Sequence, residues 1–349
     1  MAEKENQHYV PQYYFRFFNG GEQSICLLLR KTGIIRSPAP IRGQASKSYF
    51  YGDKEIENQI EEIEKILRPA QIKFRECKSP NDLTLDDRNK LLQGVMFQRS
   101  RTMTTRLDRA EAFTRMMQLQ LEVSINNDPT KTDKEKEELR SVLGLVQALP
   151  EPHQGMIMAI SLTLAEHLQD LTLIKIQNRT NRPFIFGDSP VILSNPAQKK
   201  ILNRGVLGAQ TPGILVFFPL GTDQALMLID ESTYTIKGSI RNGIIKLRNL
   251  SDLRQLNKLQ IHNATSAVYF HDIKYADYVK SLWQETKPKL TNIRGKIYEG
   301  PMRVDGREAE VIHTYDQQLP LIPNLTFLKY EEFPADSNFI ARRNPYTLF

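Results

Sequence analysis

The sequence predicts an α+β fold in which a helical N-terminal half packs on a mainly antiparallel sheet formed largely by the C-terminal half. Three observations support this prediction. Apolar residues recur at helical spacing through most of residues 54–168. Alternating or continuous apolar runs, bounded by turn residues, fill most of residues 171–230. Helices and strands are therefore grouped along the chain, which is typical of α+β rather than alternating α/β folds.

The first fifty residues predict a short helix followed by a strand pair. Pro11 fits the first helical position, where its missing N–H has no cost, and Gly20-Gly21 ends the helix. Residues 24–30 and 31–35 predict a hairpin with Gly33 in its turn. The buried side of the short helix is predicted from four apolar residues at helical spacing: Val10, Tyr14, Phe17 and Phe18.

Two long helices are predicted next. The first has one apolar stripe from Ile56 to Leu67, and Pro69 is expected to end it. The second begins near Thr84, a capping residue followed by acidic residues in the first turn, and is predicted to continue unbroken to about residue 123. After a charged loop, further helices are predicted within residues 133–140 and 150–170.

The second half of the chain predicts strands at 171–179, 182–193 and 214–230, the last stretch holding two strands joined through residues 219–221. Helices follow within 251–263 and 276–285. No repeat and no clean linker divides the chain. We therefore expect one domain over residues 1–290 and a Pro-rich, irregular C-terminal extension, residues 291–349, that packs on it.

Bulk composition narrows the class of protein. The 349 residues are 40% hydrophobic and 25% charged, which is ordinary for a globular protein. The net charge of +7 suits a polyanion such as nucleic acid. Two cysteines without metal-type spacing suit a reducing cytosol, and no apolar stretch approaches the roughly 20 residues that span a bilayer. We expect a cytoplasmic protein without a membrane partner.

His8 is the first candidate site residue. It lies just ahead of the predicted helix N-terminus, whose free N–H groups lower a histidine pKa and attract phosphate. A neutral imidazole is what a general base or a metal ligand requires. The alternative interpretation is that His8 caps the helix or packs among Tyr9 and Tyr13.

Polar residues also interrupt the apolar stripes of the two long helices. Glu57 and Glu64 share a stripe with apolar residues, so either could enter a pocket; the alternative is an exposed charged edge. The buried face of the second helix turns polar at Gln98 and Arg101. A buried arginine needs a partner, and the candidates are Glu57, Glu64, Asp188 or a bound phosphate.

Two further candidates lie in the second half. Asp188, in the stretch FGDSP, follows a strand at a turn, where sites are common, although an Asx turn explains it equally well. Asn257 lies within a helix on its apolar stripe, which indicates a buried, hydrogen-bonded side chain. The sequence contains no Walker loop, dinucleotide-binding glycine pattern, nucleophile elbow or zinc pattern.

Six segments together resemble, in their order, a bacterial family known only as domain of unknown function 4238, over residues 7–278. The segments are HYVPQYYFRFF (8–18), ENQIEEIE (57–64), QRSRT (98–102), PFIFGDSPVIL (183–193), FFPLGTDQALML (217–228) and LRQLNKLQIHNA (253–264). The resemblance assigns no reaction. It places these residues on the shared pattern: His8, Glu57, Glu64, Gln98, Arg101, Asp188 and Asn257.

This sequence departs from the family pattern in two turns. Gly187 and Ser189 stand where the family usually has serine and asparagine, and Gly221-Thr222 replaces a usual Ser-Pro. The looser turn leaves the role of the side chains around Asp188 open.

The leading hypothesis is a nuclease, favouring RNA, that acts as a bacterial defence or toxin effector. A divalent metal, Mg²⁺ or Mn²⁺, held by His8 and Asp188 would activate water; without metal, His8 would activate a ribose 2′-hydroxyl. The proposed catalytic set is His8, Glu64, Gln98, Arg101 and Asp188, and the proposed substrate-binding set is Gln12, Arg16, Glu57 and Asn257.

Two alternatives stay open. The same polar residues could bind a nucleotide or small anion without chemistry, as a sensor. They could also form a purely structural network, and a protein partner could then bind the charged segment 127–140 or the C-terminal tail.

Overall fold

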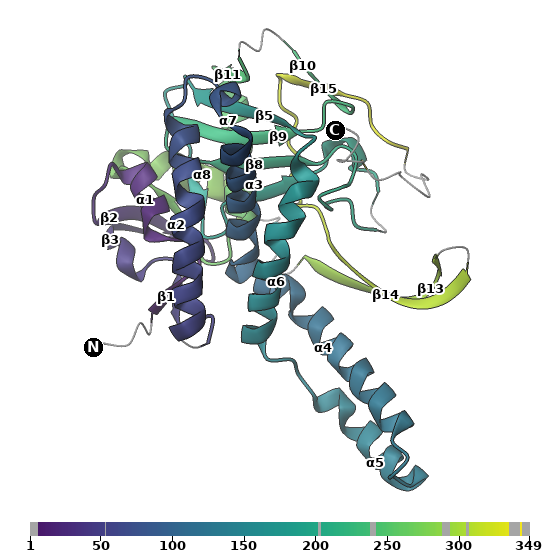
Figure 1. Cartoon of the computed structure of the whole chain (residues 1–349). Coiled ribbons are helices and arrows are strands. Elements are labelled where there is room, and N and C mark those ends of the chain that lie inside the picture. Colours follow the sequence, from purple (N-terminus) through teal and green to yellow (C-terminus); the bar gives the residue numbers. More distant parts are fainter. Residues whose placement is uncertain are drawn as a thin grey trace.

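Two sheets with mainly antiparallel strands share a large apolar core (Figure 1). The computed structural model describes residues 6–52, 54–201, 204–237, 242–287, 294–304, 307–334 and 343, with the backbone alone at 302–304 and 307–312. The first sheet has the order β11 (Ile244–Leu247), β5 (Thr172–Asn178), β9 (Gln224–Ile229), β8 (Leu215–Pro219) and β7 (Ile192–Ser194), and only the β11–β5 pair is parallel. The α+β prediction is confirmed.

The second sheet combines strands from the first fifty residues with strands from the second half of the chain. Its order is β3 (Ile35–Pro40), β2 (Ser24–Leu29), β12 (Ala267–Phe270) and β6 (Phe186–Gly187). The predicted β2–β3 hairpin is present, and β2 pairs antiparallel with β12, so that Cys26 lies opposite Phe270. The N-terminal half therefore supplies strands as well as helices.

Each of the two sheets is covered by its own set of helices. Figure 1 shows α2 (Lys54–Glu76), α3 (Leu85–Ser100) and α6 (Pro150–Leu164) side by side across the five-stranded sheet. The short α1 (Gln12–Asn19) buries Tyr14, Phe15 and Phe18 in the same core. On the second sheet, α7 (Leu250–Asn263) and α8 (Ala276–Thr286) enclose a smaller core that includes Leu28, Phe270 and Trp283.

Pro69 does not end α2, contrary to the sequence prediction. The helix continues to Glu76 because Ala70 and Phe74, one and five residues further on, are buried in the main core. Proline in a helix interior removes one backbone hydrogen bond and costs about 3 kcal/mol, which burial of a phenylalanine side chain largely offsets.

The single long helix predicted from residue 84 to about 123 is two helices. Thr84 caps α3 with a reciprocal capping box to Asp87, as the sequence indicates. The chain then turns at Arg101, and Thr102 accepts a hydrogen bond from the N–H of Thr105 to cap α4 (Met103–Asn127). The cap competes with helix continuation, because a threonine hydroxyl satisfies a free N–H of a new first turn.

The remaining elements include α5 (Asp133–Val142), which lies against α4, and three two-stranded ladders. These pair β1 (Asn6–His8) with β4 (Ser46–Ser48), β10 (Tyr234–Ile236) with β15 (Leu328–Tyr330), and β13 (Gly295–Val304) with β14 (Arg307–Asp316). The β13–β14 hairpin was not indicated by the Pro-rich sequence. Among the described residues, no helix is both long and apolar enough for a bilayer span.

Candidate functional site

Side chains from three segments, the loop before α2, α2 itself and the end of α3, meet near the chain around residues 8 and 9. Arg101, at the end of α3, donates from Nη2 to the carbonyl oxygen of His8 at 2.6 Å. Gln98, one turn earlier on α3, donates from Nε2 to the carbonyl oxygen of Tyr9 at 3.0 Å. Tyr51 donates to the carbonyl oxygen of Arg101 at 3.2 Å. We call His8, Tyr51, Glu64, Gln98 and Arg101 the His8 cluster.

Arg101 is buried and its guanidinium group is fully engaged. It is 2% exposed and pairs with Glu64 of α2, whose side chain is 20% exposed. Its Nε donates to the hydroxyl of Tyr51 at 3.1 Å. Burial alone would lower the pKa of Arg101, but Tyr51 and Glu64 raise it above its ordinary value. Of the three carboxylates considered as its partner from the sequence, the structure pairs Arg101 with Glu64.

His8 lies in β1, four residues before α1, which begins at Gln12 with Pro11 as its cap residue. Its Nε2 is 3.0 Å from the carbonyl oxygen of Arg42. A carbonyl only accepts, so Nε2 carries the hydrogen and a neutral imidazole leaves Nδ1 as an acceptor.

The pKa of His8 is lowered, in the direction that the sequence predicts but for a different main reason. Burial is the largest cause, and the charge of Arg101 lowers the pKa further, whereas the Arg42 carbonyl and Glu64 raise it. The helix end that the sequence interpretation invoked is not the main cause. His8 is therefore neutral at pH 7, which is the state that a general base needs.

Three further candidates lie on α1 and α2. Gln12 and Arg16 are half-buried on the first turns of α1, where Arg16 Nη2 donates to Gln12 Oε1 at 3.4 Å. Glu57 is buried on α2; burial is the main cause that raises the pKa of Tyr51 to about 12, and the charge of Glu57 adds to it. Within the cluster, His8 and Glu64 are half-buried and therefore partly accessible.

Asp188 follows β6 in a turn, as expected, but its carboxylate is buried within the fold. It accepts hydrogen bonds from the N–H groups of Thr265 and Ser266, both at 2.7 Å. Burial raises the pKa of Asp188 to about 6, and these N–H donors hold it from rising further. The group connects with the His8 cluster only indirectly, since Ser189 donates to Thr102, next to Arg101, at 3.2 Å.

A row of amides on α7 supports the irregular chain around Asp188. Asn257 accepts from the N–H of Ile185 at 3.1 Å and donates to the carbonyl oxygen of Pro183 at 2.9 Å. Gln260 accepts from the N–H of Gly187 at 3.0 Å, and Asn263 donates to the carbonyl oxygen of Ser189 at 2.6 Å. Asn257 is thus buried and hydrogen-bonded, and these contacts hold the backbone rather than face a cleft.

Gly187 lies too close to α7 for a side chain. A Cβ atom there would be 2.8 Å from the carbonyl oxygen of Gln260 and 3.0 Å from the Cβ of Ala264. A side chain at this position would therefore require β6 or α7 to shift.

Tyr51, Gln260 and Asn263 are members of these networks that sequence reasoning missed. A signal for the two amides was present, since residues 257, 260 and 263 recur every three residues and so lie on neighbouring turns of one helix face. Tyr51 follows other aromatic residues in SYFY, and nothing in that stretch distinguishes its hydroxyl.

The residues present do not fit a divalent metal. In the part of the chain that the structure describes, no three His, Cys, Asp or Glu side chains are grouped closely enough to hold an ion. Asp188, the carboxylate proposed to share an ion with His8, instead accepts two backbone N–H groups.

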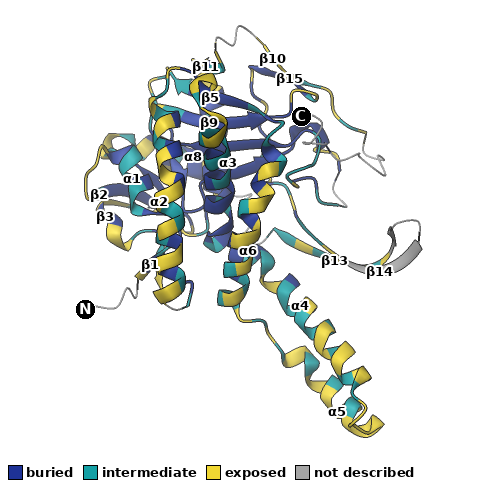
Figure 2. Cartoon of the chain, viewed as in Figure 1, coloured by how far each residue is buried: buried dark blue, intermediate teal, exposed yellow. Residues whose placement is uncertain are grey.

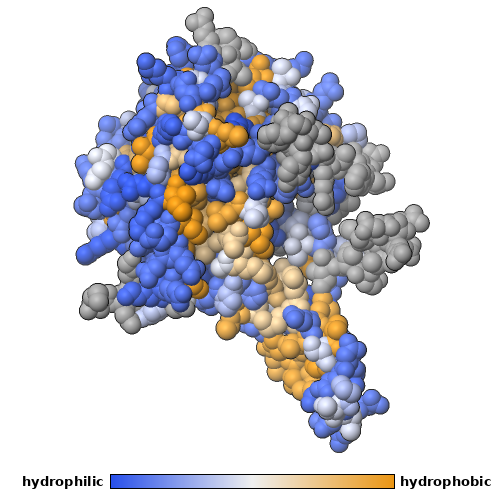
Figure 3. Space-filling model, viewed as in Figure 1, coloured by the Kyte–Doolittle hydropathy of each residue, from blue (hydrophilic) through white to orange (hydrophobic). Residues whose placement is uncertain are grey.

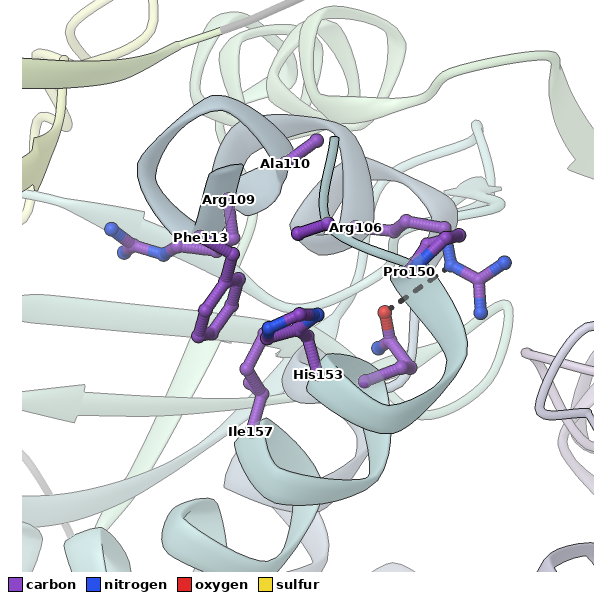
Figure 4. Close-up of a pocket in the computed structure, with 9 residues that line it drawn as sticks. Arg106, Arg109, Ala110, Phe113, Pro150, His153 and Ile157 are labelled. Atoms are coloured by element: carbon purple, nitrogen blue, oxygen red, sulfur yellow. Dashed lines mark hydrogen bonds between the residues drawn. The ribbon is translucent and has the colours of Figure 1, made fainter. Parts of the chain in front are cut away.

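A separate pocket lies between α4 and α6 (Figure 4). Its volume is only about 20 Å³, space for about one water molecule. The rings of Phe113 and His153 lie with their centroids 4.2 Å apart across it, and Arg106 Nε is 3.5 Å from Gln154 Oε1. The pocket is a packing gap where α4 leaves the body, not a substrate site.

Comparison with known proteins gives a family but no activity. No curated protein and no solved structure matches the chain. The model of one family, described as a protein of unknown function (DUF4238), matches residues 6–274. The match covers most of the chain and all the residues of the His8 cluster. The chain belongs to the DUF4238 family.

Proposed function

We propose that the protein cleaves RNA without a metal, with His8 as the general base. The observation that carries the proposal is the orientation of His8: Nε2 donates to the Arg42 carbonyl, so Nδ1 of a half-buried, neutral imidazole can accept a proton. Glu64 neutralises the charge of Arg101, so attraction for a phosphate at this position would come from Gln12 and Arg16 on α1, the helix that follows His8.

The reaction would be transesterification. His8 Nδ1 takes the proton of the ribose 2′-hydroxyl, and the 2′-oxygen attacks the adjacent phosphorus. The bond from phosphorus to the 5′-oxygen breaks and the leaving oxygen takes a proton from water. The hydroxide left behind takes the proton from His8, and a 2′,3′-cyclic phosphate remains. Because DNA lacks the 2′-hydroxyl, only RNA is a substrate.

A cleavage assay tests the proposal. The full chain should cleave labelled RNA but not DNA of the same sequence, equally in EDTA and in Mn²⁺. His8→Ala should lose at least about a hundredfold in rate, the contribution of a positioned base. His313→Ala, which alters an exposed histidine on β14, is the matched control and should keep full activity. Absence of RNA cleavage under every condition would refute the proposal.

We place this activity in a bacterial defence or toxin setting, in the cytoplasm where RNA is available. Expression of the wild-type chain in a bacterial host should then arrest growth, and His8→Ala should relieve the arrest. Equal growth of both strains at matched protein levels would argue against this setting.

The alternative is a non-catalytic nucleotide or anion sensor. A second cleft, away from His8, supports this alternative. A cleft of about 320 Å³ lies between the end of α2 and β5, lined by four basic residues and two acidic residues, Glu76 and Asp223. In the described part of the chain, Arg75 Nε is buried there without a hydrogen-bond partner. Calorimetry with pyrophosphate separates the candidates: binding lost in Arg75→Met, with RNA left uncut by the wild type, would favour the sensor. The basic residues are Arg75, Lys78, Lys175 and Arg179.

A further inference from the structure

Residues 113–149, which we call the arm, project from the body as a helical hairpin (Figure 1). The arm comprises the outer part of α4, α5 and a 3-10 turn at Leu143–Leu145. All its residues are half-buried or exposed, since the buried residues of α4 end at Ala112 and α5 has none (Figure 2). α5 has 10 residues, and isolated helices shorter than about 12–15 residues are marginal in water, so a hairpin without a buried core needs a further surface to pack on.

The arm and the adjoining face of α6 expose many large apolar side chains. Leu145 is 81% exposed and Leu149 is 68% exposed. On α6, Met156, Ile160 and Leu164 recur every four residues and form an exposed apolar stripe. Figure 3 shows apolar surface along the arm and at its junction with the body. The remaining exposed members of this surface are Met116, Leu121, Val123, Leu139 and Val142.

Such grouping is unusual for a monomer, because soluble monomers scatter exposed apolar side chains singly. A stable interface buries about 800 Å² on each partner and draws on about 20–30 residues. Ten large apolar residues and the polar residues between them supply a surface of that order.

The net charge of the arm indicates which class of partner it binds. The arm has five Lys or Arg residues against six Asp or Glu residues, a difference of one negative charge, although the whole chain carries +7. Anionic lipid and nucleic acid attract basic surfaces, so neither suits the arm. Both signs alternate along α5, from Asp133 and Lys134 to Glu137, which lets two copies of the arm place opposite charges near each other.

We propose that the arm pairs with the arm of a second copy of this chain in a two-fold dimer. Two helical hairpins that face each other form a four-helix bundle, and the two-fold axis buries the same apolar surface on both copies. The exposed stripe on α6 extends the interface to the body.

Sedimentation velocity of the full chain over a wide concentration range tests the proposal. The wild type should sediment as a dimer, and the double variant Leu145→Glu, Leu149→Glu as a folded monomer. Both leucines are exposed in the monomer, so glutamate there should not disturb its fold. Leu85→Glu, at an exposed position in the first turn of α3, is the matched control and should remain dimeric.

A second double variant, Val123→Glu with Val142→Glu, should also be monomeric. It shows whether the result of the leucine variant is due to a local change around residues 145–149. Hydrogen exchange then localises the contact: amides of residues 113–149 should exchange more slowly in the wild type than in either variant. A monomeric wild type at all concentrations, or variants that stay dimeric, would overturn the proposal. Binding of a monomeric wild type to phosphatidylglycerol vesicles would overturn it in favour of a lipid surface.

Discussion

Arg101 holds three chain segments together through one guanidinium group. It pairs with Glu64 of α2, bonds Tyr51, and donates to the carbonyl oxygen of His8 in β1. A buried arginine with several partners is costly to remove, because its partners then lie without a counter-charge.

Truncation of this side chain should therefore destabilise the fold. Arg101→Met should lower the free energy of unfolding by about 3 kcal/mol, measured by urea denaturation. Glu64→Leu in the same chain should recover part of the loss, because it removes the carboxylate left unpaired. Arg115→Met, which alters an exposed pair with Glu299, is the control and should have little effect. An equally small effect of Arg101→Met would mean that the cluster does not stabilise the fold.

Asp188 predicts a pH dependence of stability with a definite sign. Burial raises its pKa to about 6 in the folded chain, against about 3.9 in the unfolded chain. The folded chain therefore binds more protons in this interval, and the contribution of Asp188 to stability falls as the pH rises from 4 to 6. Asp188→Asn cannot titrate, so the wild-type minus variant difference in unfolding free energy should fall by on the order of 2 kcal/mol over that range. A constant difference would contradict the raised pKa.

At the scale of the element, α2 continues through a proline on its exposed side. Pro69→Ala restores the missing N–H and should raise the free energy of unfolding by about 1–3 kcal/mol. Pro152→Ala, in the first turn of α6, should change it little, because N–H groups there have no partner within the helix. Equal effects of the two variants would show that Pro69 costs α2 nothing.

The helices and strands differ in how far the sequence predicts them. Thr84 and its acidic neighbours mark the start of α3 because the capping contacts are local. The break at Thr102 was missed, since the same residue types also occur inside helices. The hairpin of β13 and β14 was missed because Gly295, Gly300 and Pro301 interrupt the alternation that predicts strands.

In the candidate site, too, some residues could be predicted from the sequence and others could not. Glu57, Gln98 and Asn257 were detected as polar residues on apolar stripes, and all three are buried. Their partners could not be predicted, because these contacts join residues far apart in the chain. Asp188, for example, accepts from N–H groups 77 and 78 residues later.

At the scale of the whole molecule, the C-terminal segment is tied to the helical half by buried charges. Asp316, at the end of β14, pairs with Arg99 of α3 at 2.7 Å and with Arg109 of α4 at 2.9 Å. Asp108 of α4 accepts from the N–H of Arg294 at 2.7 Å. Leu319, Leu325 and Leu328 then join the main core, so the packing extends beyond residue 290.

Loss of the charge on Asp316 should loosen this junction. Burial would raise the pKa of Asp316, but the neighbouring arginines hold it below its ordinary value, so its contribution to stability is present at neutral pH and lost in acid. Asp316→Asn should lower the free energy of unfolding by about 2–4 kcal/mol and speed proteolysis within 294–316. Unchanged proteolysis would show that the charges do not anchor the hairpin.

In the proposed reaction, the neutral imidazole of His8 accepts the proton of a ribose 2′-hydroxyl. The most direct test is the product of an RNA in which one ribose alone is 2′-deoxy, cleaved in EDTA by the full chain. Cleavage should leave 2′,3′-cyclic phosphate ends at the other positions and should not occur at the deoxy position. The rate should rise with pH as His8 loses its proton and then level off, with the midpoint below the ordinary histidine pKa. Cleavage at the deoxy position, or ends without a cyclic phosphate, would contradict it.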